Sequence, residues 1–326
     1  MNKCAVVLGC LVVNVMGWGQ VSVPEERAGT EAVLTETREA FPTDLQFRGA
    51  MGPSFAEEVV MLVNQERLNN GGLPPLKHNA LLDDSSLLHS TNMGARDFFA
   101  HCDLDTMTDP GDRMTTEGYF WNWAAENIAA GQADPQSVMT GWMASTGHRN
   151  NILSTNYREI GVGYFFNSGD SGNIRRDLND DCLADSFNNG PFFRYWTQNF
   201  GRRNNVFPVI INREAYSTDD EMVQLYLYGA GSVTEMRIRN AGGAWTSWQA
   251  FQSEVPWTLD ALNGVRQVDV ELRNGPTVYS ASDTILLMLV CQADEALFNR
   301  YPDWDLDLVN MQELVAINDG LCSNLN

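Results

Sequence analysis

Basic residues are scarce in this 326-residue chain, which holds 21 lysines and arginines against 42 aspartates and glutamates. The formal net charge of -21 repels the phosphate backbone of nucleic acids and the anionic surface of membranes alike. We therefore expect no nucleic-acid partner. Because hydrophobic residues make up 44% of the chain and charged residues only 19%, the acidity is expected on a folded surface rather than in a disordered chain.

Long hydrophobic runs are also missing. The apolar run from Ala5 to Met16 stops short of the roughly 20 residues that a membrane-spanning helix needs. With Lys3 before it and small residues after it, residues 1–19 are predicted to be a secretory signal peptide. A lipid anchor at Cys10 is the less favoured alternative, because the apolar stretch before that cysteine is short. We expect a secreted protein, extracellular or periplasmic, without a transmembrane span.

Cysteines are few, and four of the six follow the predicted signal peptide: Cys102, Cys182, Cys291 and Cys322. No two of these four have the C-x-x-C spacing of a thiolate zinc site. An even number in an exported chain indicates disulfides. Of the three possible pairings we favour Cys102 with Cys182 and Cys291 with Cys322, because each bridge then stays within one region.

The length favours two folded domains, each able to bury its own core. An acidic linker over residues 20–50 precedes a first domain at 51–205. Helices are predicted from Ser54, which forms a capping box with Glu57, over 81–99, and from Asp134 to Gly147.

The second of these helices is expected to bury Leu87 and Leu88. Strands are predicted at 160–166 and 193–200, on either side of a polar insert at 167–190. Helices around a small sheet indicate α-β-α layers.

The second domain is predicted at residues 206–293 and is all-β. Val223, Leu225 and Leu227 alternate with other residues, as the side chains of a half-buried strand do. Several such patterns separated by turns favour an immunoglobulin-like sandwich. The acidic tail at 294–326 has alternating aspartates near Asp303, but it lacks the glycine and the last glutamate of a calcium loop, so a solvated turn is the preferred interpretation.

The chain has only four histidines, and two of them stand in unusual surroundings. His101 follows an aromatic pair, and His148 is expected at the end of the third helix. Neutral imidazoles bind zinc, and Glu126 could be a third ligand, hold a ring tautomer, or act as a base on bound water. Buried, hydrogen-bonded histidines are the alternative interpretation. His78 and His89 are expected to be structural or exposed.

A series of short motifs lies between residues 54 and 201. In chain order they are Asn64–Arg67, Gly72–Leu76, Phe98–His101, Asp112–Arg113, Glu117–Tyr119, Ala125–Gly131, Gly147–Arg149, Ile160–Gly163 and Tyr195–Gly201. In order and spacing this series resembles the bacterial branch of the CAP superfamily, also called SCP/TAPS or pathogenesis-related-1-like. The resemblance covers under half of the chain.

The resemblance implies a three-layer α-β-α sandwich with a cleft lined by two histidines and two glutamates that can hold a divalent metal, often zinc. Carried over by motif, the metal-binding histidines are His101 and His148, and the first glutamate is Glu126. The second glutamate would fall at Ser145, so the set of four is incomplete. Glu159 could reach the cleft instead, but its place just before the strand at 160–166 favours surface or salt-bridge duty. Because the family places Arg113 and Arg149 in structural turns, they are expected to be loop-fixing ion-pair partners rather than substrate clamps.

The fold class expected is therefore α+β, a CAP sandwich followed by an all-β immunoglobulin-like domain. The favoured function is a secreted binding module whose cleft, lined by His101, Glu126, Ser145 and His148, takes a small lipid-like ligand, a peptide or a glycan. One alternative is a metal-dependent hydrolase with Glu126 as the base. Another is a structural or adhesive protein that contacts an extracellular protein.

Overall fold

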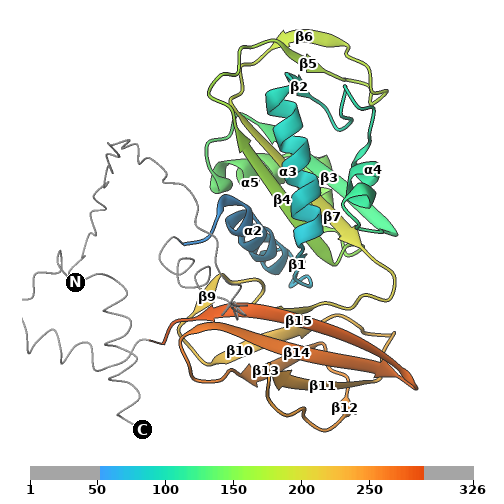
Figure 1. Cartoon of the computed structure of the whole chain (residues 1–326), viewed down its shortest axis with the longest axis vertical. Coiled ribbons are helices and arrows are strands. Elements are labelled where there is room, and N and C mark those ends of the chain that lie inside the picture. Colours follow the sequence, from blue (N-terminus) through green and yellow to red (C-terminus); the bar gives the residue numbers. More distant parts are fainter. Residues whose placement is uncertain (1–51, 290–326) are drawn as a thin grey trace, which may run out of the picture. The chain divides into compact units, whose positions relative to one another are not determined.

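The computed structural model of the chain describes residues 52–289 (Figure 1). Several sequence predictions fall outside the described residues, namely the signal peptide, the linker, lipidation of Cys10, the Cys291–Cys322 bridge and the acidic tail. None of the helices within 52–289 is long and apolar enough to cross a lipid bilayer.

The first folded region combines helices with two small sheets. Its elements are α2 (Phe55–Asn69), β1 (Lys77–His78), α3 (Ala80–Ala95), β2 (Phe98–Phe99), α4 (Pro110–Thr116), β3 (Trp123–Ala130), α5 (Pro135–Ala144), α6 (Thr146–Leu153), β4 (Glu159–Phe166), β5 (Ile174–Arg176), β6 (Ser186–Asn189) and β7 (Arg194–Arg202). The main sheet has the order β1-β4-β7-β3, which places β3 at an edge, and the smaller sheet has the order β2-β5-β6.

Helices cover both faces of the main sheet. On one face, apolar side chains of α2 and α5 share a core with β4 and β7, in which Val63, Trp142 and Trp196 are buried. On the other face α3 packs along β4 and β7 (Figure 1). The predicted α-β-α layers are therefore present, and the capping box of Ser54 and Glu57 that begins α2 is confirmed.

Two glycines of β4 explain how closely α3 lies on the sheet. A Cβ atom on Gly163 would lie 2.2 Å from the backbone nitrogen of Leu87, and one on Gly161 would meet the helix backbone equally closely. The helix face at this contact is small and polar, because Ser86 and Ser90 donate hydrogen bonds to the carbonyls of the two glycines.

This packing overturns one sequence prediction. Leu87 and Leu88 were expected to be buried, but their exposed fractions are 46% and 40%. The close approach to glycines turns the serine face of α3 inward, so the two leucines point away from the sheet. Helix periodicity alone favoured the larger apolar side chains.

The ends of two helices also differ from the prediction. Helix α3 stops at Ala95 because Asp97 adopts a left-handed conformation with φ of 57°, and Phe98–Phe99 then form strand β2. The third predicted helix breaks at Ser145, whose extended backbone separates α5 from α6. His148 therefore lies near the start of α6. Strand β3, which carries Glu126, was not predicted.

The second folded region is all-β, as predicted. Its strands are β8 (Val209–Ile211), β9 (Ser217–Thr218), β10 (Met222–Leu227), β11 (Glu235–Asn240), β12 (Gln249–Ala250), β13 (Glu254–Thr258), β14 (Gly264–Asn274) and β15 (Thr277–Leu287). They form sheets of order β13-β10-β8 and β12-β11-β14-β15-β9, which enclose one apolar core. Val223, Leu225 and Leu227 point into this core. The immunoglobulin-like topology stays a prediction.

Hydrogen bonds join the two regions within one compact unit. Arg213 donates to the carbonyl of Leu73 at 2.7 Å, and the Tyr228 hydroxyl donates to the carbonyl of Pro75 at 2.9 Å. Lys77 of β1 forms ion pairs with Glu214 and with Asp283 of β15.

Candidate functional site

Glu126 is the centre of the candidate site. It lies on the edge strand β3, and its side chain is only 1% exposed. One carboxylate oxygen lies 2.8 Å from Nδ1 of His101, and the other accepts a hydrogen bond of 2.7 Å from Nη2 of Arg113. Both oxygens are therefore engaged, which makes Glu126 the link between an exposed imidazole and a buried guanidinium.

Arg113 fixes the loop that carries His101. Its guanidinium is 3% exposed and donates to the carbonyls of Thr108, at 2.7 Å, and of His101, at 3.0 Å. Arg149 has a similar local role, because it donates to the carbonyl of Met143 at 2.8 Å. Arg113 is therefore the loop-fixing ion-pair partner that was expected, whereas Arg149 binds a backbone carbonyl.

The electrostatics keep Glu126 ionised. Burial raises the pKa of Glu126, but the charge of Arg113 and the neighbouring His89 and His101 outweigh it and lower the pKa to about 2. Burial lowers the pKa of His101, but the hydrogen bond that its ring donates to Glu126 outweighs this, so the pKa of His101 is raised. The carboxylate therefore favours a ring that is protonated at Nδ1.

His148 lies near enough to His101 for the charge of one ring to act on the other. Partial burial and the charge of His101 lower the pKa of His148, which favours a neutral imidazole. Its ring makes no hydrogen bond to another side chain of residues 52–289, while its backbone carbonyl accepts one of 3.2 Å from Asn127. His101 is therefore bound to a carboxylate, whereas the His148 ring has no side-chain hydrogen-bond partner among residues 52–289.

Within the described residues, no hydrogen bond joins the remaining predicted residues, Ser145 and Glu159, to the rings of His101 or His148. Ser145 ends α5 and begins α6, its side chain forms no capping hydrogen bond, and within 52–289 none joins it to His148. Glu159 forms the expected salt bridge, at 2.6 Å to Arg203, and with 2% exposure it lies inside the fold. Tyr119 also donates to Glu159.

Two sets of residues border the site without having been predicted. His89 was expected to be structural, and it is completely buried, with Nε2 2.9 Å from the carbonyl of Ala100, next to His101. Burial lowers the pKa of His89 to about 4. Asn127 binds the side chains of Gln198 and Asn151 and so fixes the His148 backbone. The sequence signal for Asn127 was its position next to Glu126 in one strand. Neighbouring residues of a strand face opposite sides, so Asn127 is expected on the side that Glu126 does not face.

The predicted disulfide between Cys102 and Cys182 is confirmed. Cys102 follows His101 directly, so the bridge attaches the loop between β5 and β6 beside the site. The charge of Asp180 in this loop contributes to the raised pKa of His101. The polar insert therefore adds negative charge next to the imidazole pair.

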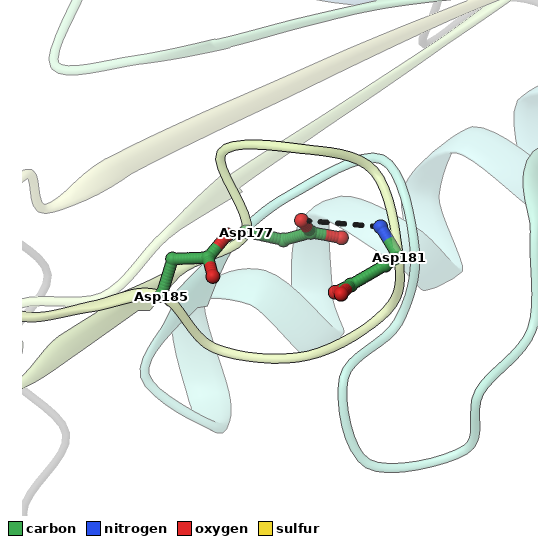
Figure 2. A group of neighbouring side chains, drawn as sticks. All are labelled: Asp177, Asp181 and Asp185. Atoms are coloured by element: carbon green, nitrogen blue, oxygen red, sulfur yellow. Dashed lines mark hydrogen bonds between the residues drawn. The ribbon is translucent and has the colours of Figure 1, made fainter.

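The same loop holds an acidic group. Among residues 52–289, Asp177, Asp181 and Asp185 offer oxygens that all lie within 4.8 Å of one another (Figure 2). Asp177 also accepts hydrogen bonds from the backbone nitrogens of Asp181 and Cys182. Carboxylates are ligands for hard cations such as Ca²⁺. Exposed acidic groups are common without an ion, so we assign no role to this one.

The two histidines fit a divalent metal only in part, because among residues 52–289 the ligand atoms of His101, Glu126 and His148 do not all lie within 4.8 Å of one another. His101 uses Nδ1 for Glu126 and keeps Nε2 available, which is the arrangement of a metal-binding histidine oriented by a carboxylate. Because both oxygens of Glu126 are engaged, the donors on offer are two imidazoles, fewer than the three protein ligands of catalytic zinc sites. Zinc binding stays a prediction.

Comparison with known proteins points to one family. Residues 60–200 match the model of the family described as CAP, the cysteine-rich secretory protein family. The chain is 36% identical over 138 residues to the uncharacterized protein YkwD of Bacillus subtilis, which covers 42% of this chain and 50% of YkwD. It is 28% identical over 107 residues to the uncharacterized membrane protein YlbC of the same organism, covering 33% of this chain and 30% of YlbC. The chain thus spans half or less of these relatives.

Solved structures with partial similarity include an extracellular protein containing an SCP domain from Bacillus anthracis. It has a TM-score of 0.35 and 28% identity, over 46% of this chain and 40% of that one. An outer surface protein from Borrelia burgdorferi has a TM-score of 0.35 and 15% identity, over 47% of this chain and 97% of that one.

The family model matches the segment in which the sequence motifs occur. His101, Glu126 and His148 all fall inside it. Residues 60–200 of this chain therefore form a CAP domain of the cysteine-rich secretory protein family.

Proposed function

We propose that this protein is an extracellular binding protein whose CAP domain presents His101 and His148 as the contacting pair. The observation that carries the proposal is that both oxygens of the buried Glu126 are already bonded, to His101 and to Arg113. A general base must reach the proton that it removes. Glu126 instead orients His101, which favours binding over hydrolysis.

The surroundings of the pair favour a polar ligand. The side chains that border it are imidazoles, amides and the acidic loop that the Cys102–Cys182 bridge holds nearby. Imidazoles recognise carboxylates and hydroxyl groups through hydrogen bonds. A peptide or glycan therefore suits this face better than a small apolar ligand does.

A divalent metal ion such as zinc would be held by Nε2 of His101 and by the His148 ring, with water completing its coordination. Such an ion supplies an electrophilic site for an oxygen-bearing ligand. Glu126 would keep the His101 ring in the required tautomer.

An extracellular location is part of the proposal. The Cys102–Cys182 disulfide supports it, because structural disulfides persist in oxidising compartments. The excess of acidic residues is consistent with solubility in an extracellular medium.

Calorimetric titration of zinc chloride into the metal-stripped protein tests the pair. We expect micromolar binding that is lost in both His101→Ala and His148→Ala. His78→Ala is the matched control, because His78 pairs with Asp83 on a different part of the fold and its loss should leave zinc binding unchanged. Absence of zinc binding, or binding that persists in both site variants, overturns the metal assignment.

A second assay separates binding from hydrolysis. The protein is incubated with a fluorogenic peptide and ester library, with and without zinc, beside Glu126→Gln. We expect no turnover above that of buffer. Turnover that disappears in Glu126→Gln, while the variant stays folded by circular dichroism, would establish the hydrolase instead.

A further inference from the structure

A large cavity lies away from the histidine pair, where the CAP domain meets the β region. Its volume is about 980 Å³, and its walls come from the start of α2, from β1, α3 and β4, and from the β region around Glu214 and β15. His101, Glu126 and His148 are not among its lining residues. The volume is at the upper end of the range for small-molecule sites.

One wall of this cavity carries an unbalanced group of charges. Lys77 binds both Glu214, at 2.9 Å, and Asp283, and all three line the cavity. Their side chains are 19%, 11% and 3% exposed, so the group is largely removed from water. One ammonium faces two carboxylates, which leaves one negative charge uncompensated when all three are ionised.

The two carboxylates of the group do not receive equal numbers of hydrogen bonds. Asp283 also accepts hydrogen bonds of 2.7 Å from the backbone nitrogens of Ile211 and Thr284. Among residues 52–289, Glu214 has Lys77 as its hydrogen-bond donor. A buried carboxylate with one donor is costly to keep ionised, and a second cation would stabilise it.

The other walls of the cavity carry apolar side chains beside the acidic Glu57, Asp83 and Asp84. The apolar ones include Phe55 of α2, Leu87 of α3, Tyr164 of β4 and Leu286 of β15. Leu87 is 46% exposed, although the helix periodicity favours its burial. An occupant with an apolar body would cover this side chain.

We propose that this cavity binds an organic ammonium that carries an apolar chain, with the ammonium at Glu214 and the chain against Leu87 and Leu286. The ammonium supplies the cation that the group around Lys77 lacks, and the chain removes exposed apolar surface from water. The site is separate from the histidine pair, so it stands or falls independently of the function proposed above.

Proton linkage gives this binding a pH dependence. Burial and the neighbouring Asp283 raise the pKa of Glu214 to about 7, although Lys77 and His78 oppose the shift. Below this pH Glu214 is mostly protonated and attracts a cation weakly. His78, which also faces this group, is itself held by Asp83 of α3. We therefore expect tighter ammonium binding at pH 8 than at pH 6.

The test uses calorimetry on the full chain with dodecylammonium below its micelle concentration, beside dodecyl sulfate and octyl glucoside. We expect dodecylammonium to bind at pH 8 and the anionic amphiphile not to bind. Glu214→Gln leaves Lys77 paired with Asp283 and should weaken the binding of dodecylammonium by about tenfold. Glu235→Gln is its control, since that glutamate pairs with Arg273 on the surface of the β region.

The apolar wall is tested separately with Leu87→Asn. This change should weaken the binding of dodecylammonium. Leu88→Asn should not, because Leu88 is exposed on the same helix but does not line the cavity. Equal affinity in Glu214→Gln, or equal binding of the sulfate, overturns the proposal. An absence of dodecylammonium binding also overturns it, and this is the result expected if another part of the chain fills the cavity. Dimerisation of the protein that Leu87→Asn suppresses would overturn it as well.

Discussion

The two folded regions differ in what they bury. Within residues 52–289, the CAP domain buries charged and amide side chains such as Arg67, Arg113, Glu126 and Gln198. The β region buries an almost purely apolar core, and Asp283, which points to Lys77 of the CAP domain, is its buried charge.

The two kinds of interior contribute differently to the protein. An apolar core stabilises without directing, because hydrophobic burial has no preferred geometry. Buried polar groups must each find a partner, so they fix side chains at defined positions. The CAP domain uses this rigidity to hold His101 through Glu126 and Arg113. The β region provides a wall for the cavity and a stable body.

The largest effect is expected from breaking the buried charge pair of the CAP domain. Glu126→Ala leaves the guanidinium of Arg113 buried without its carboxylate, so we expect a loss of about 3–5 kcal/mol in the free energy of unfolding. Urea denaturation followed by circular dichroism measures it.

A double variant shows whether charge or packing causes that loss. Glu126→Leu combined with Arg113→Met removes both charges and should recover much of the stability. A double variant as unstable as Glu126→Ala would mean that the CAP interior depends on packing as the β core does, and the comparison would fail.

An intermediate effect is expected where α3 meets β4. Gly163→Ala places a Cβ 2.2 Å from the helix backbone and should cost about 1–3 kcal/mol or more in the free energy of unfolding. Gly147→Ala is the matched control, because open space surrounds that position in α6, and alanine favours a helix by up to about 1 kcal/mol. Thermal unfolding of both variants gives the comparison, and equal melting temperatures would contradict the close approach.

The last effect depends on pH and is expected at the junction of the two regions. The folded pKa of Glu214 is raised from 4.5 to about 7, so the folded state binds more protons between these values. The stability that this group contributes is therefore present below the unfolded pKa and lost as the pH rises through about 7. Glu214→Gln should lose less stability than the unchanged protein between pH 5 and pH 8, as measured by urea denaturation at each pH. An identical pH dependence would show that Glu214 has an ordinary pKa.

The sequence predicted elements best where the signal was local. The capping box at Ser54, the strand at 160–166 and the alternation of Val223 and Leu225 depend on neighbours along the chain, and all three are confirmed. The choice of buried face on α3 failed, because it depends on Gly161 and Gly163, which lie far away in the sequence. Strand β3 was missed since its buried residues include Glu126 and Asn127, which look polar to any hydrophobic pattern.

By itself the sequence indicated the CAP domain, the net acidic charge, the favoured partner of Cys102 and the residue types of the candidate site, because motifs and composition are properties of the chain. Only the tertiary structure decided that Glu126 binds Arg113 and orients His101. Only the tertiary structure showed that Glu214 and Asp283 both form ion pairs with Lys77 at the wall of a cavity. Charge and burial act through distances in space, and residues separated by many positions acquire those distances only when the chain folds.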